Sequence, residues 1–211
     1  MSNIYILSDK KVKGAINLPV FEIEFIAQDI DLKSYDAIIF TSKNGIYSID
    51  SFNQDWKDIP SYAIAPLTAD VIKEYGGKLV YTSSQSYGDD FAQELIPILK
   101  DKKAIFLRAQ KVISNLDGIL KDAGIDLVDI AIYKTVIKKS IDKSLQPPKG
   151  STIIFSSPST IDGFFTHFTW DDSYKAVAIG RVTAAHLPNE IDCKVAPKPS
   201  LPGCVEFASN L

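Results

Sequence analysis

The chain has 211 residues, of which 45% are hydrophobic and 23% charged, and its formal net charge is −3. This composition suits one large or two small globular domains with real cores, and its acidic balance argues against binding to nucleic acid or a membrane surface. No apolar run reaches the roughly 18 residues of a membrane span, and the amino terminus shows no signal-peptide pattern, so we expect a cytosolic protein.

The residues that most often hold metals are scarce in this sequence. Cys193 and Cys204 form neither a disulfide framework nor a metal-ligand spacing, and only His167 and His186 could be added to them. No glycine-rich phosphate loop is present, which argues against a nucleotide-dependent enzyme. We therefore expect no metal and no cofactor.

The amino-terminal region predicts two strands, at residues 3–8 and 18–25. In the second, Glu22 and Glu24 alternate with apolar residues, as in a half-buried strand. From Asp36 a regular alternation of strands and helices begins, which is typical of a parallel sheet covered by helices. The strands are predicted at 37–41, 62–65, 78–82, 104–107 and 127–133, and the helices at 45–52, 68–75, 89–99 and 113–123.

The carboxyl third repeats part of this pattern. The segment Thr152-Ile-Ile-Phe-Ser-Ser-Pro-Ser-Thr-Ile161 matches Ala37-Ile-Ile-Phe-Thr-Ser-Lys-Asn-Gly-Ile46 at an offset of 115 residues (153 − 38). The segment Val177-Ala-Ile-Gly-Arg-Val-Thr-Ala184 matches Tyr62-Ala-Ile-Ala-Pro-Leu-Thr-Ala69 at the same offset (183 − 68). An offset this long indicates duplicated domains. It also predicts three further strands, at 152–155, 176–179 and 194–196.

The repeat fixes the expected domain organisation. The carboxyl third lacks counterparts of the last two strands of the middle domain, while the amino terminus holds two strands without a domain. We therefore predict an α/β protein with two similar five-stranded parallel sheets, the second domain inserted in the first. The first comprises residues 1–26 and 140–211, and the second residues 34–132. Segments 27–33 and 133–139 form a linker that pairs as a two-stranded ribbon beside a cleft.

The motifs together resemble those of the uroporphyrinogen-III synthase family. The matching pieces are Phe40-Thr-Ser-Lys-Asn-Gly45, Ala65-Pro-Leu-Thr-Ala69, Leu107-Arg108, Gly124 with Ile132-Tyr-Lys-Thr135, Phe155-Ser-Ser-Pro158 and Ile179-Gly-Arg-Val-Thr-Ala184. They span nearly the whole chain in the family's order, although Ala65-Pro66 replaces a glycine common there. The resemblance implies two flavodoxin-like (HemD-like) domains. It also implies a lyase of heme biosynthesis that closes hydroxymethylbilane into a macrocycle without a cofactor, with inversion of ring D.

The resemblance also implies the residues that contact this substrate. A linear tetrapyrrole of this kind carries eight carboxylates, and helix N-termini favour carboxylates through free N–H groups and the helix dipole. We expect several helix ends to face one cleft. The candidate substrate-binding residues are Thr41, Ser42, Lys43, Asn44, Thr68, Arg108, Ser156, Ser157, Ser159 and Thr183. Each hydroxyl taken alone is better explained as an ordinary helix cap.

Tyr133 is the candidate catalytic residue. Loss of the substrate's hydroxyl as water needs a proton donor, and the family's proposed general acid is a tyrosine at this motif position. The other interpretation is a strand tyrosine that packs against the sheet. The resemblance implies a monomer and allows a transient contact with the preceding enzyme of the pathway. A two-lobed protein that binds small anions or tetrapyrroles without catalysis remains an alternative function.

Overall fold

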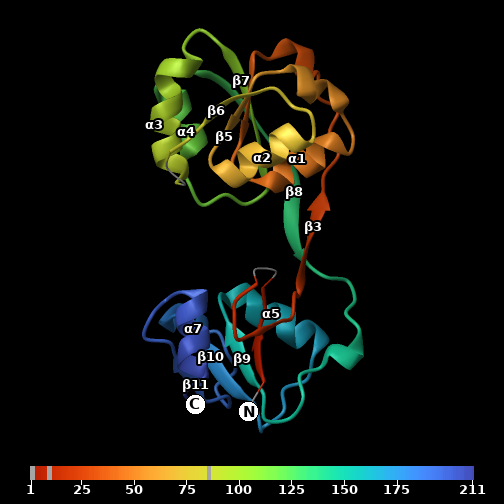
Figure 1. Ribbon diagram of the computed structural model, residues 1–211, viewed down its shortest axis with the longest axis vertical. Helices are drawn as coiled ribbons and strands as arrows, with labels where there is room; N and C mark the ends of the chain where they lie inside the picture. Colours follow the sequence, from red (N-terminus) through yellow and green to blue (C-terminus); the bar gives the residue numbers. More distant parts are fainter. Residues whose placement is uncertain (1–2, 9–10, 85–86) are drawn as a thin grey trace. The chain divides into compact units, whose positions relative to one another are not determined.

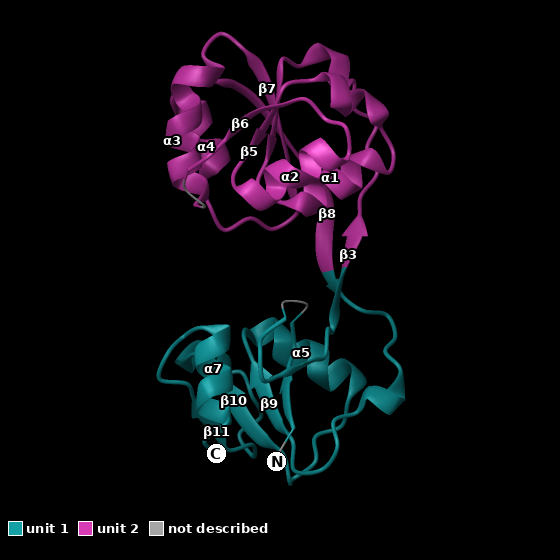
Figure 2. Cartoon of the chain, viewed as in Figure 1, with its two compact units in different colours: residues 1–22, 136–211 teal, residues 23–135 magenta. Residues whose placement is uncertain are grey.

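The structure is a computed structural model that describes residues 3–8, 11–84 and 87–211. The chain divides into two compact units (Figure 2). Unit 1 comprises residues 1–22 and 136–211, and unit 2 comprises residues 23–135. Each unit contains one sheet built mainly of parallel strands, with helices between most of the successive strands (Figure 1).

The sheet of unit 1 has five strands in the order β11-β10-β9-β1-β2, and all its pairs are parallel. Its strands are β1 (Ile4–Ile6), β2 (Ile16–Asn17), β9 (Thr152–Phe155), β10 (Lys175–Ala178) and β11 (Cys193–Val195). Its helices are α5 (Pro158–His167), α6 (Arg181–Ala184) and α7 (Leu201–Ala208), preceded by the 3-10 helix η3 (Lys143–Leu145).

Alternation along β9 gives unit 1 a core on both faces of its sheet. Ile153 and Phe155 pack with Phe164 of α5, whereas Ile154 packs with Cys204 of α7. Successive side chains of a strand point to opposite faces, so the continuous apolar run of β9 fills both layers.

The sheet of unit 2 has six strands in the order β3-β8-β7-β4-β5-β6. They are β3 (Phe21–Phe25), β8 (Asp126–Ile137), β7 (Lys103–Ala109), β4 (Ala37–Phe40), β5 (Ser61–Ala63) and β6 (Leu79–Thr82). The pairs from β8 to β6 are parallel. β3 runs antiparallel to β8, because Ile26 N–H bonds to Ile132 C=O at 2.8 Å and Lys138 N–H bonds to Val20 C=O at 2.9 Å.

The helices of unit 2 form two layers (Figure 1). One layer contains α1 (Lys43–Asp50) and α2 (Pro66–Glu74), and the other contains α3 (Gly88–Leu99) and α4 (Leu116–Asp122). Phe40 of β4 faces the first layer and Ile39 faces the second. The 3-10 helices η1 (Leu32–Ser34) and η2 (Gln54–Asp58) adjoin the first layer.

The repeat seen in the sequence extends to strand pairing. In unit 2, Ile38, Ile39 and Phe40 pair with Ser61, Tyr62 and Ala63. In unit 1, the residues 115 positions later pair in the same way: Ile153 with Ala176, Ile154 with Val177 and Phe155 with Ala178. The two sheets therefore share one register where their sequences match.

The amino-terminal strands differ from the prediction. Residues 18–25 were expected as the second strand of the first sheet, but β2 takes that place and β3 is a sixth strand in the sheet of unit 2. The expected linker segment 27–33 lies in unit 2, where Ile30 and Leu32 join the core. The alternation in 21–25 predicts a strand correctly, but alternation does not say which sheet the strand joins.

Candidate functional site

Hydroxyl side chains follow the central strand of each sheet. Thr41 and Ser42 come after β4 and lead into α1, and Ser156 and Ser157 come after β9 and lead into α5. All four are partly buried. The carboxyl end of a parallel strand is the edge at which open α/β sheets bind ligands, so each pair lies at the appropriate edge of its own sheet.

The N-terminus of α1 is capped by Ser42, whose hydroxyl accepts the Asn44 N–H at 3.2 Å. Lys43, the first residue of the helix, is exposed, and Asn44 is partly buried. No acidic residue lies in the first turn of this described helix. The positive end of the helix dipole is therefore not offset by an acidic side chain in its own first turn.

The N-terminus of α5 is built differently. The Thr160 hydroxyl accepts the Ser157 N–H at 3.2 Å and donates to the Ser157 carbonyl at 2.6 Å. The Ser157 hydroxyl lies 3.0 Å from that of Ser159, which is exposed. Thr160 thus organises the turn, while two serine hydroxyls form a pair at the helix start.

Thr68 and Thr183 were expected to open their helices, and this is wrong. α2 begins at Pro66 and α6 at Arg181, so each threonine is the third helical residue, and they are 6% and 4% exposed. The residues before the helices, Ala65 and Gly180, provide no side-chain cap. α6 spans only four residues, so its dipole is much weaker than that of α2.

Tyr133 is buried in unit 2, with 6% of its surface exposed, and belongs to the same core cluster as Phe40 and Ile132. A β-bulge explains why two consecutive residues reach this core. Arg108 of β7 pairs with Ala131 of β8, but Ala109 pairs with Tyr133, which leaves Ile132 as the extra residue. Without the bulge, Ile132 and Tyr133 would point to opposite faces.

The Tyr133 side chain meets the N-terminus of α1. It forms a hydrogen bond with the Ser42 side chain. Burial raises the pKa of Tyr133 above its ordinary value of 10.0, and the bond to Ser42 partly opposes this shift. Tyr133 is therefore a protonated hydroxyl at neutral pH, placed beside a helix N-terminus.

Arg108 is engaged by groups of the protein itself. Its Nε and Nη2 lie 2.7 and 2.6 Å from Asp129 Oδ2, and its Nη1 donates to the Ala109 carbonyl at 3.0 Å. Lys121 also contacts Asp129, at 2.6 Å. The Lys121 hydrogen bond, followed by that of Arg108, holds the pKa of Asp129 below its ordinary value. These contacts leave Arg108 fewer donors for a substrate carboxylate.

The structure adds features at the same edges that sequence reasoning missed. Leu67 and Val182, which correspond at the offset of 115, are the second residues of α2 and α6 and are 67% and 79% exposed. Tyr87 before α3 and Ile113 before α4 are also highly exposed. α4 begins at Leu116, so the helix expected from residue 113 starts later. The repeat already aligns Leu67 with Val182, but the sequence does not show that both side chains are exposed.

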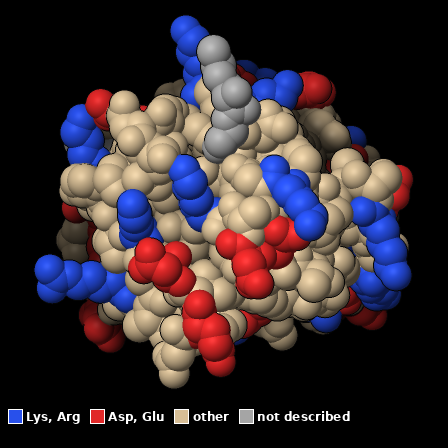
Figure 3. All heavy atoms as spheres, turned by 90° about the horizontal axis from the view of Figure 1, so that it is seen from below, with Lys and Arg blue, Asp and Glu red and all other residues tan. Residues whose placement is uncertain are grey.

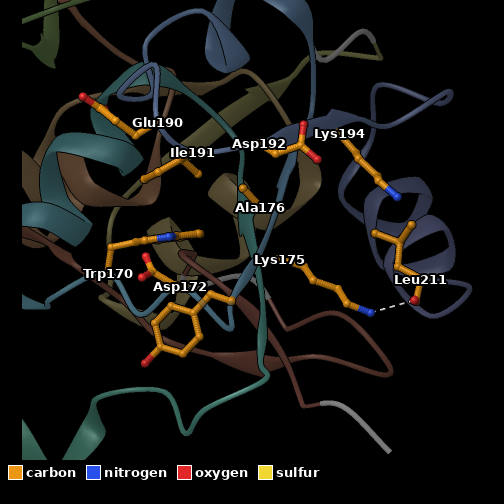
Figure 4. A pocket seen from close by; sticks show the side chains of 10 residues that line it. Trp170, Asp172, Lys175, Ala176, Glu190, Ile191, Asp192, Lys194 and Leu211 are labelled. Atoms are coloured by element: carbon orange, nitrogen blue, oxygen red, sulfur yellow. Dashed lines mark hydrogen bonds between the residues drawn. The ribbon is translucent and has the colours of Figure 1, made fainter.

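A separate pocket of about 500 Å³ lies in unit 1 (Figure 4). Trp170 and Tyr174 line it together with charged side chains of both signs, and Lys175 in its wall donates to the Leu211 carbonyl at 2.6 Å. Apart from Leu211, the lining residues precede β10 or β11 or lie in their first two positions. This pocket is therefore at the amino ends of the strands, away from the hydroxyls that follow β9.

Charged side chains of both signs are interspersed on the face drawn in Figure 3. No extended single-sign patch is visible there among the described residues. Among the described helices, none has both the length and the apolar character needed to cross a bilayer.

These features define an α/β protein whose parallel sheets place helix N-termini and hydroxyls at their carboxyl edges, where open α/β sheets bind ligands. The chain belongs to the uroporphyrinogen-III synthase family: the family profile described as "Uroporphyrinogen-III synthase HemD" matches residues 13–206. The family acts on a tetrapyrrole, so the substrate is a small molecule of porphyrin biosynthesis.

One solved structure supports this assignment. The chain is similar to the crystal structure of uroporphyrinogen-III synthetase from Helicobacter pylori, with 27% identity, a TM-score of 0.72 and coverage of 100% of this chain and 99% of that one. It also matches a mutant uroporphyrinogen III synthase from the extremely thermophilic bacterium Thermus thermophilus, with 13% identity, a TM-score of 0.49 and coverage of 100% and 98%. No match was found among curated protein sequences.

Proposed function

We propose that this protein is a cyclising hydro-lyase that converts hydroxymethylbilane to uroporphyrinogen III, with inversion of ring D and loss of water. Family membership supports the overall reaction. The observation in this chain that best supports it is the pair of equivalent strand ends, each with hydroxyls and a helix N-terminus at the edge where such sheets bind ligands.

The distribution of acidic residues supports carboxylate binding at particular helices. Asp89 and Asp90 lie in the first turn of α3, and Asp117 lies in that of α4. Within the described part of the chain, the first turns of α1, α2 and α5 have no acidic residue. A helix end adds about 0.3–1 kcal/mol for an exposed anion, and charge-assisted hydrogen bonds to its amides add roughly 1.5–3 kcal/mol. Several such ends suffice for a polyanion.

The proposed carboxylate contacts are Thr41, Ser42, Lys43, Asn44, Thr68, Ser156, Ser157, Ser159 and Thr183, with Arg108 in a supporting role. The burial of Thr68 and Thr183 favours contact through their turns over direct contact through their hydroxyls. Leu67 and Val182 expose apolar surface beside those turns, which suits the flat pyrrole rings between the substrate's carboxylates.

Tyr133 is the proposed proton donor. As the carbon–oxygen bond of the substrate's hydroxymethyl group breaks, the Tyr133 hydroxyl transfers its proton to the leaving oxygen, which departs as water. The last pyrrole ring attacks the cationic azafulvene left behind through the α-carbon that already carries its methylene bridge. That bridge bond then breaks and re-forms at the ring's other α-carbon, which inverts the ring, and the proton lost from that carbon returns to the Tyr133 oxygen. A raised pKa keeps the phenol protonated, and Ser42 orients it.

We also propose a domain organisation and an oligomeric state for this chain. We propose two domains close to the two compact units, residues 1–22 with 136–211 and residues 23–135. The chain passes between them within the paired strands β3 and β8, and not within the ribbon expected from residues 27–33 and 133–139. The protein acts as a monomer in the cytosol, without a cofactor, and makes at most a transient contact with the preceding pathway enzyme.

The test is to supply the protein with hydroxymethylbilane and to separate the products. Type III product in excess over the spontaneous type I isomer supports the enzyme. Type I alone, together with tight binding of the tetrapyrrole, would favour the alternative, a two-lobed binding protein without catalysis. Type I alone without binding would reject both.

A further inference from the structure

Ser48 of α1 is a fully buried serine in the interior of a helix. Serine in that setting commonly bonds to the carbonyl four residues earlier in its own helix. Here the hydroxyl donates instead to the carbonyl of Ile132, which is 84 positions away in β8. The contact connects the helix that Ser42 caps with the strand that carries Tyr133.

Ile132 is the extra residue of the bulge in β8, and the bulge determines where Tyr133 points. Bulges locally disrupt the ladder of hydrogen bonds, so the position of the bulged residue depends on other contacts. The Ile132 carbonyl has two: the Ile26 N–H at 2.8 Å and the Ser48 hydroxyl. The first holds β8 to β3, and the second holds it to α1.

The other copy of the fold shows that this hydroxyl is not required by helix packing alone. The residue 115 positions after Ser48 is Gly163 of α5, which lies close to Val20: a Cβ added there would come within 2.6 Å of Val20 Cγ2. The copy without the tyrosine-bearing bulge has no side chain at this position. Only the copy that contains Tyr133 places a hydroxyl there.

We propose that Ser48 is a positioning residue for Tyr133: by binding the Ile132 carbonyl it fixes the bulge against α1 and so holds the Tyr133 hydroxyl beside Ser42. The inference rests on the proposed function, in which Tyr133 donates the proton. Ser48 itself does not touch the substrate in this mechanism.

The substitution Ser48→Ala removes the contact without leaving the Ile132 carbonyl unpaired, because Ile26 still donates to it. We expect kcat for type III product to fall on the order of tenfold, the scale of one lost hydrogen bond, with KM changed less than about twofold. The share of spontaneous type I product should rise accordingly. Ser48→Thr keeps a hydroxyl and should restore most of the rate.

Ser61→Ala is the matched control. Ser61 is also a fully buried serine of unit 2, and its hydroxyl donates to the Ile59 carbonyl at 3.2 Å, away from Tyr133. We expect Ser61→Ala to lower the melting temperature by a similar amount to Ser48→Ala with kcat unchanged. Equal loss of kcat in both variants would assign Ser48 a purely structural role and overturn the proposal.

The double variant Ser48→Ala/Tyr133→Phe tests whether Ser48 affects kcat through the Tyr133 hydroxyl. If Ser48 acts through the Tyr133 hydroxyl, adding Ser48→Ala to Tyr133→Phe should cost less than about twofold, because the group it positions is already gone. A further tenfold loss in the double variant would contradict the proposal.

An NMR titration of isotope-labelled tyrosine separates this inference from the proposed function. The pKa of Tyr133 should rise in Ser48→Ala, because the opposing bond to Ser42 is weakened, and should stay unchanged in Ser61→Ala. If the wild type makes no type III product but the pKa moves as expected, the function fails and the positioning role stands. An unmoved pKa overturns the positioning role, whatever the products are.

Discussion

Tyr133 combines a buried ring with a hydroxyl that reaches the start of α1. Replacing it by phenylalanine keeps the ring and removes only the hydroxyl, so turnover should fall strongly while the melting temperature changes little. Product analysis and thermal denaturation together check this. If both fall in proportion, Tyr133 has a packing role only.

The raised pKa of Tyr133 adds a pH dependence to the same comparison. The neutral phenol is favoured in the folded state, so its contribution to stability is present below the ordinary pKa of 10.0 and is lost as the pH rises through the higher folded value. Tyr133→Phe should therefore lose less stability than the wild type above about pH 10.

Arg108 is the site residue whose geometry most favours a structural role. Its planar guanidinium contacts Asp129 and the Ala109 carbonyl together, which a lysine ammonium cannot reproduce. Arg108→Lys should cost about 1–2 kcal/mol of unfolding free energy and leave KM nearly unchanged. A large increase in KM at unchanged stability would restore a direct role in substrate binding.

Because Arg108 is paired with Asp129, the stability difference between the wild type and Arg108→Lys should depend on pH. Because the pKa of Asp129 is lowered in the folded state, its contribution is present above the ordinary value of 3.8 and is lost as the pH falls through the lower folded value. Denaturation of wild type and Arg108→Lys at neutral and strongly acidic pH should show their difference shrinking in acid.

For single residues, the sequence predicted which residue types lie at the candidate site, but not which hydrogen bonds and ion pairs they form. The motifs place Tyr133 at the end of a strand, yet only the register of β8 against β7 shows that a bulge turns it toward α1. Arg108 looks like a free cation in the sequence. Its partner Asp129 is 21 residues away and becomes a neighbour only when β7 and β8 pair.

The starts of α2 and α6 lie at corresponding positions of the two units. Each has an uncapped start, an exposed apolar second residue and a buried threonine third. The sequence located both strands and both turns but placed the threonines at the helix ends, because N-cap preferences favour hydroxyls there. In the structure each helix begins two residues earlier, and α2 begins at Pro66, a residue type favoured at the first helical position.

Leu67→Ser and Val182→Ser test whether these elements contact substrate. Both side chains are largely exposed, so unfolding free energy should change by less than about 0.5 kcal/mol. If they contact pyrrole rings, KM for hydroxymethylbilane should rise several-fold. Leu145→Ser is the control, since Leu145 is 50% exposed but precedes the amino end of β9. Unchanged KM in both test variants would remove the apolar contact from the proposal.

At the scale of the whole molecule, each unit has its own sheet and its own two core clusters. The ends of unit 2 lie in paired strands, with Ile26 bonded to Ile132. We expect residues 23–135 produced alone to fold and to unfold cooperatively, since their hydrophobic core needs no other segment. Circular dichroism during heating measures this, and a non-cooperative melt would show that unit 2 depends on the rest of the chain.

The strand pattern and the 115-residue offset predicted most of the strands and both layers of helices, because these depend on local periodicity. The exceptions lie where the chain passes between units. β3 alternates like any half-buried strand, and only its pairing with β8 gives unit 2 a sixth strand. Such long-range pairing depends on topology, which periodicity does not encode.

The two sheets share one spatial order but not one order along the chain. In unit 2 the strands from β4 to β8 follow in sequence, whereas in unit 1 the strands in the places of β7 and β8 are β1 and β2, which precede all the others. Moving residues 1–22 to follow residue 211 would turn the protein into a plain tandem array. A tandem fusion of two identical domains would acquire the present order if its two ends were joined and the chain were cut at a new place, between the strands that are now β11 and β1.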